Sequence, residues 1–244
     1  MKSIIIVFAL LLSNTLTFGF GSDVTRKTLE LAEFSAIYVN SGYTVHLKQS
    51  NKQEVTVEAI SEIFDLTKLE VENGILHINI ERKQKDPDAS IWSKIDDIKI
   101  SPTMNVYISV RDINTIKVNG NGKVVSENSL AANTLNLSIS GSGSMNLDVK
   151  GKEVKTEVSG SGDLKLKGYA TSNTIKMSGS GSIHAFECDI QYAEVEQSGS
   201  GVCEINVSQE LEAKVYGSGS IKHKGSTKSV TKKVYGSGEI DRAY

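Results

Sequence analysis

The tripeptide Gly-Ser-Gly recurs six times after residue 140 of this 244-residue chain. The copies begin at Gly141, Gly160, Gly179, Gly199, Gly217 and Gly236, and a Gly120-Asn121-Gly122 variant lies one period earlier. Successive copies are 21, 19, 19, 20, 18 and 19 residues apart. A fixed period of this length is typical of stacked supersecondary units, each of which leaves an apolar edge that only its neighbour can cover. The repeat therefore predicts a solenoid.

Apolar residues keep fixed positions relative to these glycines. Four residues after each leading glycine the column reads Val124, Met145, Leu164, Ile183, Cys203, Ile221 and Ile240. Two residues before each leading glycine it reads Val118, Ile139, Val158, Met177, Gln197, Val215 and Val234. Because alternate side chains of a strand point to opposite faces, the two columns are expected to form facing walls of one core. We predict an all-β, parallel β-solenoid with about 19–20 residues per coil.

The corner glycines are predicted to be structural turn residues. A sharp corner requires positive φ, which glycine adopts at little cost, and a Cβ there would crowd the neighbouring coil. The positions are Gly120, Gly122, Gly141, Gly143, Gly160, Gly162, Gly179, Gly181, Gly199, Gly201, Gly217, Gly219, Gly236 and Gly238. At a strand spacing of about 4.7 to 4.9 Å, seven coils rise roughly 29 Å.

The amino terminus has the order of a secretory signal peptide. Lys2 precedes the apolar run from Ile4 to Leu12, and small residues follow, so cleavage is expected after Gly19 or Gly21. Nine apolar residues are too few to span a bilayer. We assign residues 1–21 to the signal peptide and expect an exported protein, periplasmic, in the outer envelope or secreted, without a transmembrane segment in the mature chain.

Residues 22–118 are less regular and are expected to form a β-rich cap continuous with the regular repeat of residues 119–244. The segment from Phe34 to Leu47 alternates like a strand pair, and its Ser41-Gly42 resembles a degenerate corner. Asn73-Gly74, between two alternating runs, predicts a β-hairpin. The polar insert from Lys83 to Lys94 contains Trp92, the only tryptophan. Two interpretations remain open: a binding loop, or a Trp92 that packs against the first coils.

Charged residues enter the core columns near the end of the repeat. His223 and Arg242 take the inward position six residues after the leading glycine, and Lys232 enters the opposite wall, so the last coils are expected to be partly solvated and the final edge blunted by charge. Tyr216 and Tyr235 replace the serine that precedes the corner in earlier coils, and they form either a small contact surface or ordinary packing.

The two cysteines are not expected to form a disulfide. Cys188 and Cys203 are fifteen residues apart, whereas vertical neighbours would be nineteen or twenty apart. Cys203 falls in the inward column, where it serves as a small core residue.

No pattern of chemistry-bearing residues predicts a catalytic, cofactor or metal site. The 27 basic and 29 acidic residues give no basic stripe, which argues against nucleic acid as a partner. The carboxylates fall in different columns, among them Asp148, Asp163, Glu187 and Glu204. The histidines lack metal spacing or a neighbouring nucleophile; they are His46, His77, His184 and His223. We expect no enzyme activity.

The repeated Ser-Gly-Ser-Gly core, the FSAIYVNSGYTVHL opening and the VENGILHI hairpin resemble the GIN-domain family of bacterial auto-transporter adhesin heads. The similarity covers almost the whole mature chain. It implies a β-solenoid related in shape to pectin-lyase-like folds, in a secreted or envelope protein with a role in cell adhesion, and it carries over no catalytic residue.

Three functions remain open. The first is an adhesin or binding module that presents a rigid solenoid surface to a surface glycan or protein ligand. The alternatives are a structural envelope spacer and a carbohydrate-active enzyme of pectin-lyase-like shape, because fold alone does not fix function. No heptad stalk is present, so a monomer or weak oligomer is expected.

Overall fold

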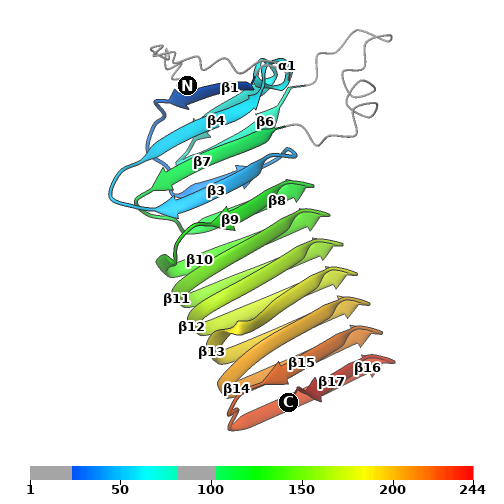
Figure 1. Cartoon of the computed structure of the whole chain (residues 1–244). Coiled ribbons are helices and arrows are strands. Elements are labelled where there is room, and N and C mark those ends of the chain that lie inside the picture. The colour runs from blue at the N-terminus through cyan, green and yellow to red at the C-terminus, as the bar shows by residue number, and fades with distance from the viewer. Residues whose placement is uncertain (1–23, 82–102, 244) are drawn as a thin grey trace, which may run out of the picture.

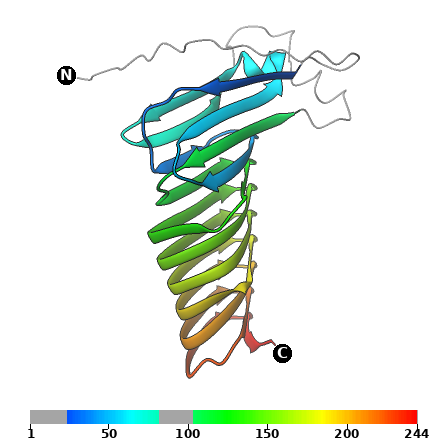
Figure 2. The ribbon, with the colours of Figure 1, turned by 60° about the vertical axis from the view of Figure 1, so that its left-hand side comes forward.

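The computed structural model describes residues 24–81 and 103–243, which form a continuous β-solenoid (Figure 1). The predicted signal peptide, the insert from Lys83 to Lys94 and Trp92 lie outside the described residues. The coils stack along one axis, with the amino-terminal strands at one end and the carboxy-terminal strands at the other (Figure 2).

The regular part of the stack is built from parallel rungs. Its strands are β8 (Thr115–Gly120), β9 (Lys123–Ser126), β10 (Leu130–Gly141), β11 (Ser144–Gly160), β12 (Asp163–Gly179), β13 (Ser182–Gly199), β14 (Val202–Gly217), β15 (Ser220–Lys224), β16 (Ser229–Gly236) and β17 (Glu239–Arg242). The pairing sets Gly141 opposite Gly160, and Gly160 opposite Gly179. Each leading glycine up to Gly236 is paired with the next in the same way. The predicted parallel solenoid, with one rung per Gly-Ser-Gly, is confirmed.

Both glycines of a corner are required, for different reasons. Gly160 has φ of +106°, a conformation that residues with a Cβ rarely adopt. Gly162 has no positive φ, but a Cβ on it would lie 2.4 Å from Cγ2 of Ile139 and 3.0 Å from the carbonyl oxygen of Gly143 in the neighbouring coil. The first glycine therefore supplies the turn and the second allows the coils to approach each other.

Each coil has two faces that meet at the corner. We call the strand segments that lead into the corner the entry face and those that leave it the exit face. On the far side, strands β11 to β14 are continuous for 16 to 18 residues and pass through a bend. In these four coils the chain therefore returns toward the next corner without leaving the strand.

The core consists of the predicted columns. The column that follows the corner is buried from Val124 to Ile221, and Ile240 in the last coil is 7% exposed. The opposite column contains Gln197, whose Nε2 donates a hydrogen bond to the carbonyl oxygen of Gly201. The buried hydroxyl of Thr156 donates to Oδ1 of Asn173 at 3.1 Å. Each of these contacts satisfies one polar group, whereas Oε1 of Gln197 and Nδ2 of Asn173 are buried without a hydrogen-bond partner among the described residues.

The amino-terminal coils are not stacked in sequence order. The strands involved are β2 (Ala36–Val39), β3 (Thr44–Gln49), β6 (Ile75–Ile80) and β7 (Met104–Val110). β2 lies between β6 and β8, and β3 lies between β7 and β9, all in parallel. The coil that contains Ser41-Gly42 is therefore enclosed by two coils that come later in the chain.

Antiparallel strands close the amino-terminal end. β4 (Glu54–Ile60) pairs with β7 and with β1 (Val24–Leu29). The short helix α1 (Ser61–Phe64) connects β4 to β5 (Thr67–Glu72), which pairs with β6. The hairpin between β5 and β6 turns at Asn73 (φ 52°) and Gly74 (φ 75°), which confirms the prediction made from this dipeptide.

The carboxy-terminal end is covered by charge. Every residue of β16 is exposed, which agrees with the expected solvation of the last coil. The ammonium of Lys232 donates to the carbonyl oxygen of Ile240 at 2.8 Å, across the end of the core. His223, six residues after Gly217, is only 4% exposed. The core column to which it belongs is therefore still buried in this coil, where we expected partial solvation.

Cys188 and Cys203 are buried and free. Cys188 is paired with Gly168 near the far bend, whereas Cys203 is paired with Ile183 in the inward column. Burial raises the pKa of each thiol to about 12, with a smaller contribution from neighbouring carboxylates. Both side chains therefore serve as core residues.

Candidate binding surface

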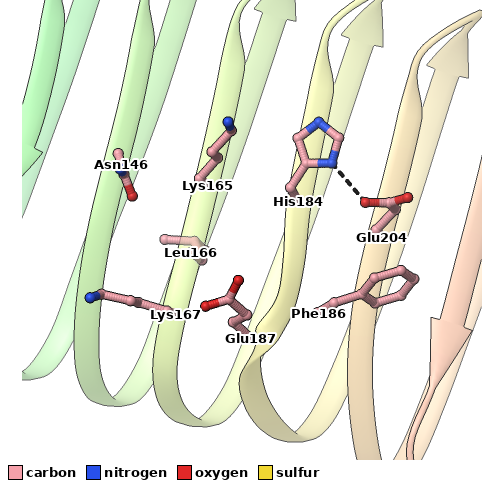
Figure 3. A pocket seen from close by; sticks show the side chains of 8 residues that line it. All are labelled: Asn146, Lys165, Leu166, Lys167, His184, Phe186, Glu187 and Glu204. Atoms are coloured by element: carbon pink, nitrogen blue, oxygen red, sulfur yellow. Dashed lines mark hydrogen bonds and ion pairs between the residues drawn. The ribbon is translucent and has the colours of Figure 1, made fainter.

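A shallow groove of about 420 Å³ crosses the exit face over strands β11 to β14 (Figure 3). It is lined by Asn146, Lys165, Leu166, Lys167, His184, Phe186, Glu187 and Glu204. The side chains come from four consecutive coils, so a ligand in the groove would lie across several rungs.

A β-bulge shapes this groove. In the pairing of β12 with β13, Lys165 lies opposite His184 but Lys167 lies opposite Glu187, so β13 has one extra residue here. On the other side, β13 loses register with β14 between Ala185 and Asp189. A bulge disrupts the ladder and re-aims side chains. Phe186, which falls within it, consequently lines the groove.

The repeat lengths explain where the bulge occurs. The coil from Gly179 to Gly199 has 20 residues and the next coil, ending at Gly217, has 18, whereas the two coils before them have 19 each. The extra residue of the 20-residue coil lies at the bulge in β13. Sequence analysis did not identify this surface, although the irregular spacing was the signal that marks it.

His184 lies between two carboxylates at the upper part of the groove. Its Nδ1 is 2.7 Å from Oε2 of Glu204, and its Nε2 is 3.4 Å from Oδ2 of Asp163. The three residues come from β13, β14 and β12, respectively. Each ring nitrogen of His184 therefore lies close to a carboxylate oxygen of a neighbouring coil.

This cluster links two of the acidic residues that the sequence places in different columns. Asp163 and Glu204 do occupy different columns, three and five residues after their glycines. His184 brings them together because it is paired directly with Glu204 and reaches Asp163 diagonally. Each of Lys165, His184 and Glu204 lies five residues after the leading glycine of its coil. The sequence therefore already places these three side chains in one outward row.

The lower part of the groove combines charge with an aromatic ring. Nζ of Lys167 is 3.6 Å from Oδ2 of Asp148 in the preceding coil. The ammonium of Lys224 lies 5.1 Å from the centroid of the Phe186 ring, a cation–π contact. The surface thus offers hydrogen-bond donors, acceptors and an apolar ring side by side.

Two further aromatic contacts lie on the amino-terminal coils. On the exit face the rings of His46 and Tyr107 stack at 4.9 Å, and the guanidinium of Arg26 lies 5.1 Å from the Tyr107 centroid. On the entry face Tyr38 contacts His77 edge to face at 5.3 Å. These contacts fix neighbouring strands to one another.

The described residues contain no group of three His, Cys, Asp or Glu side chains arranged to hold a metal ion. Within the same residues, no helix has the length and apolar character needed to cross a bilayer. Trp92, for which a binding loop and packing against the first coils were both left open, lies outside the described part of the chain.

The fold and the groove define a parallel β-solenoid that presents a polar surface to solvent. A family model described as "Putative auto-transporter adhesin, head GIN domain" matches residues 33–227, and the chain belongs to this family. The resemblance seen in the sequence is confirmed. Among curated proteins, none matches the chain.

Solved structures share the fold over most of the chain. A "putative adhesin" from Bacteroides fragilis is 23% identical with a TM-score of 0.80, and the match covers 91% of this chain and 98% of that one. A "putative adhesin" from Parabacteroides distasonis is 22% identical, with a TM-score of 0.72 and coverage of 91% and 98%. A "putative lipid binding protein" from the same species is 22% identical, with a TM-score of 0.71 and coverage of 91% and 97%. These descriptions name adhesins and a binding protein, not enzymes.

Proposed function

We propose that the protein is an exported, non-catalytic adhesin-type module that binds a cell-surface glycan in the groove of its exit face. The observation that carries the proposal is the bulge in β13, which interrupts an otherwise regular surface and lines the groove with Phe186 beside charged residues. Family membership supports an adhesin-like binding role.

The chemistry of the groove suits a sugar. Glycan hydroxyls both donate and accept hydrogen bonds, and the groove supplies carboxylate acceptors together with amide and ammonium donors. The apolar face of a sugar ring can pack on Phe186. The carboxylates of Asp163 and Glu204 are both engaged by His184, which favours a fixed binding surface over a freely available acid–base pair.

The proposal includes the organisation of the chain. Residues 1–21 would direct export, residues 22–118 would close the amino-terminal end, and residues 119–244 would carry the groove. Mass analysis of the exported protein tests the first part, because its amino terminus should lie just after Gly19 or Gly21.

Glycan-array screening of the exported protein, followed by calorimetry on the best ligand, tests the binding role. We expect Phe186→Ala and Glu204→Gln each to weaken binding by about tenfold, which corresponds to about 1.4 kcal/mol. Tyr192→Ala and Lys176→Ala are matched controls outside the groove and should bind normally. Absence of any glycan or protein ligand would favour the spacer, whereas turnover of a polysaccharide by the purified protein would favour the enzyme.

A further inference from the structure

The carboxy-terminal end carries a charge opposite to that of the rest of the chain. Residues 211–244 contain seven of the 27 basic residues and only three of the 29 acidic ones. Residues 1–210 therefore have 20 basic and 26 acidic residues. An end of one sign on a molecule of the other sign attracts an oppositely charged partner and orients it.

Two tyrosines add an aromatic platform to this end. The rings of Tyr216 in β14 and Tyr235 in β16 stack with their centroids 5.0 Å apart and their planes within 6°. They are 39% and 56% exposed, so the stack packs against itself and remains open to solvent. The sequence left packing and contact surface open for these residues, and their exposure favours a contact surface.

Two lysines stand beside the tyrosines on the entry face. Lys214 and Lys233 are directly paired across β14 and β16, a like-charge neighbour pair that is unfavourable in the free protein. Lys214 is compensated by Glu212 at 2.9 Å and Glu194 at 3.8 Å. Within the described part of the chain, Lys233 forms no ion pair.

Protection of the last strand edge by charge does not explain why Lys233 lies beside the tyrosines. Lys232 points across the end of the core to the carbonyl oxygen of Ile240 and fulfils that role. Lys233 alternates with Lys232 along the strand and points outward, in the same row as Lys214. The pKa of Glu212 is lowered mainly by its hydrogen bond to Lys214 and only slightly by the more distant charge of Lys233, so Lys233 and the exposed tyrosines remain accessible to a ligand.

We propose that Lys214, Tyr216, Lys233 and Tyr235, here called the terminal patch, bind an acidic glycan that bears carboxylates. A tyrosine and a lysine two residues apart on one face of a strand are separated by about 7 Å. A sugar ring can pack on the tyrosine while its carboxylate meets the ammonium group. The adjacent strand repeats the pair about 4.8 Å away, so a repeating acidic glycan meets two equivalent pairs.

This inference rests on the proposed binding function and specifies a ligand class and a second surface for it. Because the terminal patch is on the entry face and the groove is on the exit face, variants can separate the two. The probe is a polygalacturonate oligosaccharide, and its methyl-esterified form is the matched ligand without charge. Calorimetry on the exported protein measures both at low and moderate salt.

We expect the carboxylate form to bind at least tenfold more tightly than the ester and to lose affinity as salt rises. Lys233→Gln and Tyr235→Ser should each lower that affinity by about tenfold. Lys176→Gln, which lies in the same row two coils from Lys214 and three from Lys233, and Tyr192→Ser are the control variants and should leave it unchanged. Circular dichroism of each variant shows that the fold is retained.

Equal affinity for the acid and its ester would overturn the proposal, as would an equal loss with Lys176→Gln. Binding of phosphatidylglycerol vesicles without binding of polygalacturonate would also overturn it. If Phe186→Ala abolishes polygalacturonate binding while Lys233→Gln does not, the groove function stands and the terminal patch is refuted.

Discussion

Replacing one corner glycine should destabilise the protein far more than replacing another glycine with room around it. In Gly160→Ala the new Cβ would lie 2.7 Å from the carbonyl oxygen of Gly141. That oxygen already accepts a hydrogen bond from the backbone of Ser161 at 2.9 Å, so it cannot move away freely. The residue would also have to retain a φ of +106°.

These two effects give the expected magnitude. A residue with a Cβ in a left-handed conformation costs roughly 1–2 kcal/mol, and overpacking of a tight interior costs about 1–3 kcal/mol. We therefore expect Gly160→Ala to lower the free energy of unfolding by roughly 2–5 kcal/mol. For a chain of this size that corresponds to a fall in Tm of roughly 4–20 °C.

Urea and thermal unfolding followed by circular dichroism measure this change. Gly42→Ala is the control, because its Cβ would meet its nearest neighbour, Oδ1 of Asn121, at 3.5 Å and its φ is not positive. The control should lie within about 0.5 kcal/mol of the original protein. A loss below about 1 kcal/mol for Gly160→Ala, or equal losses for both variants, would refute the account of the corner.

Three further predictions concern single positions. Deletion of Phe186 should restore a 19-residue coil, keep the thermal transition and abolish groove binding, whereas binding that survives the deletion would contradict the role of the bulge. In the native protein Cys188 and Cys203 should resist alkylation at neutral pH, because burial raises the pKa of both thiols to about 12, and mass spectrometry should show labelling only after denaturation. Burial, together with the nearby charge of Lys232, lowers the pKa of His223 below its usual value of 6.5. At acidic pH the unfolded chain therefore binds this proton more readily than the folded protein does, so the free energy of unfolding falls as pH drops below about 6.5. Urea midpoints between about pH 7.5 and pH 5 should fall less for His223→Leu, and equal falls would contradict this mechanism.

The regular coils were predictable because one rule fixes all of them. A glycine that must turn and an apolar residue four positions later define the corner and the core, and each rung repeats the same constraint. The hairpin at Asn73-Gly74 was predictable for a similar reason, since both residues adopt positive φ in a local turn. Local backbone chemistry and strict periodicity are both visible along the chain.

The order of the amino-terminal coils was not predictable in this way. Alternation in residues 34–47 indicates a coil but does not say which strands lie on either side of it. β2 accepts β6 on one edge and β8 on the other, and both partners are apolar inward and polar outward. Spacing along the sequence cannot choose between partners that present the same pattern, so tertiary pairing decides.

The groove shows why a repeat protein carries its specific chemistry at irregular positions. Where each coil has 19 residues, every outward row continues from rung to rung and the surface has no preferred point. The 20-residue and 18-residue coils break that regularity around Phe186, and the two coils flanking the bulge supply Lys165 and Glu204 to the same hollow. The register of β13 with β14 shifts twice, between Ala185 and Asp189 and between Ile190 and Tyr192, yet Cys188 and Ile190 stay buried, so the inner wall remains filled. A solenoid can therefore change its binding surface by adding or removing one residue in one coil while the stack that supports it is preserved.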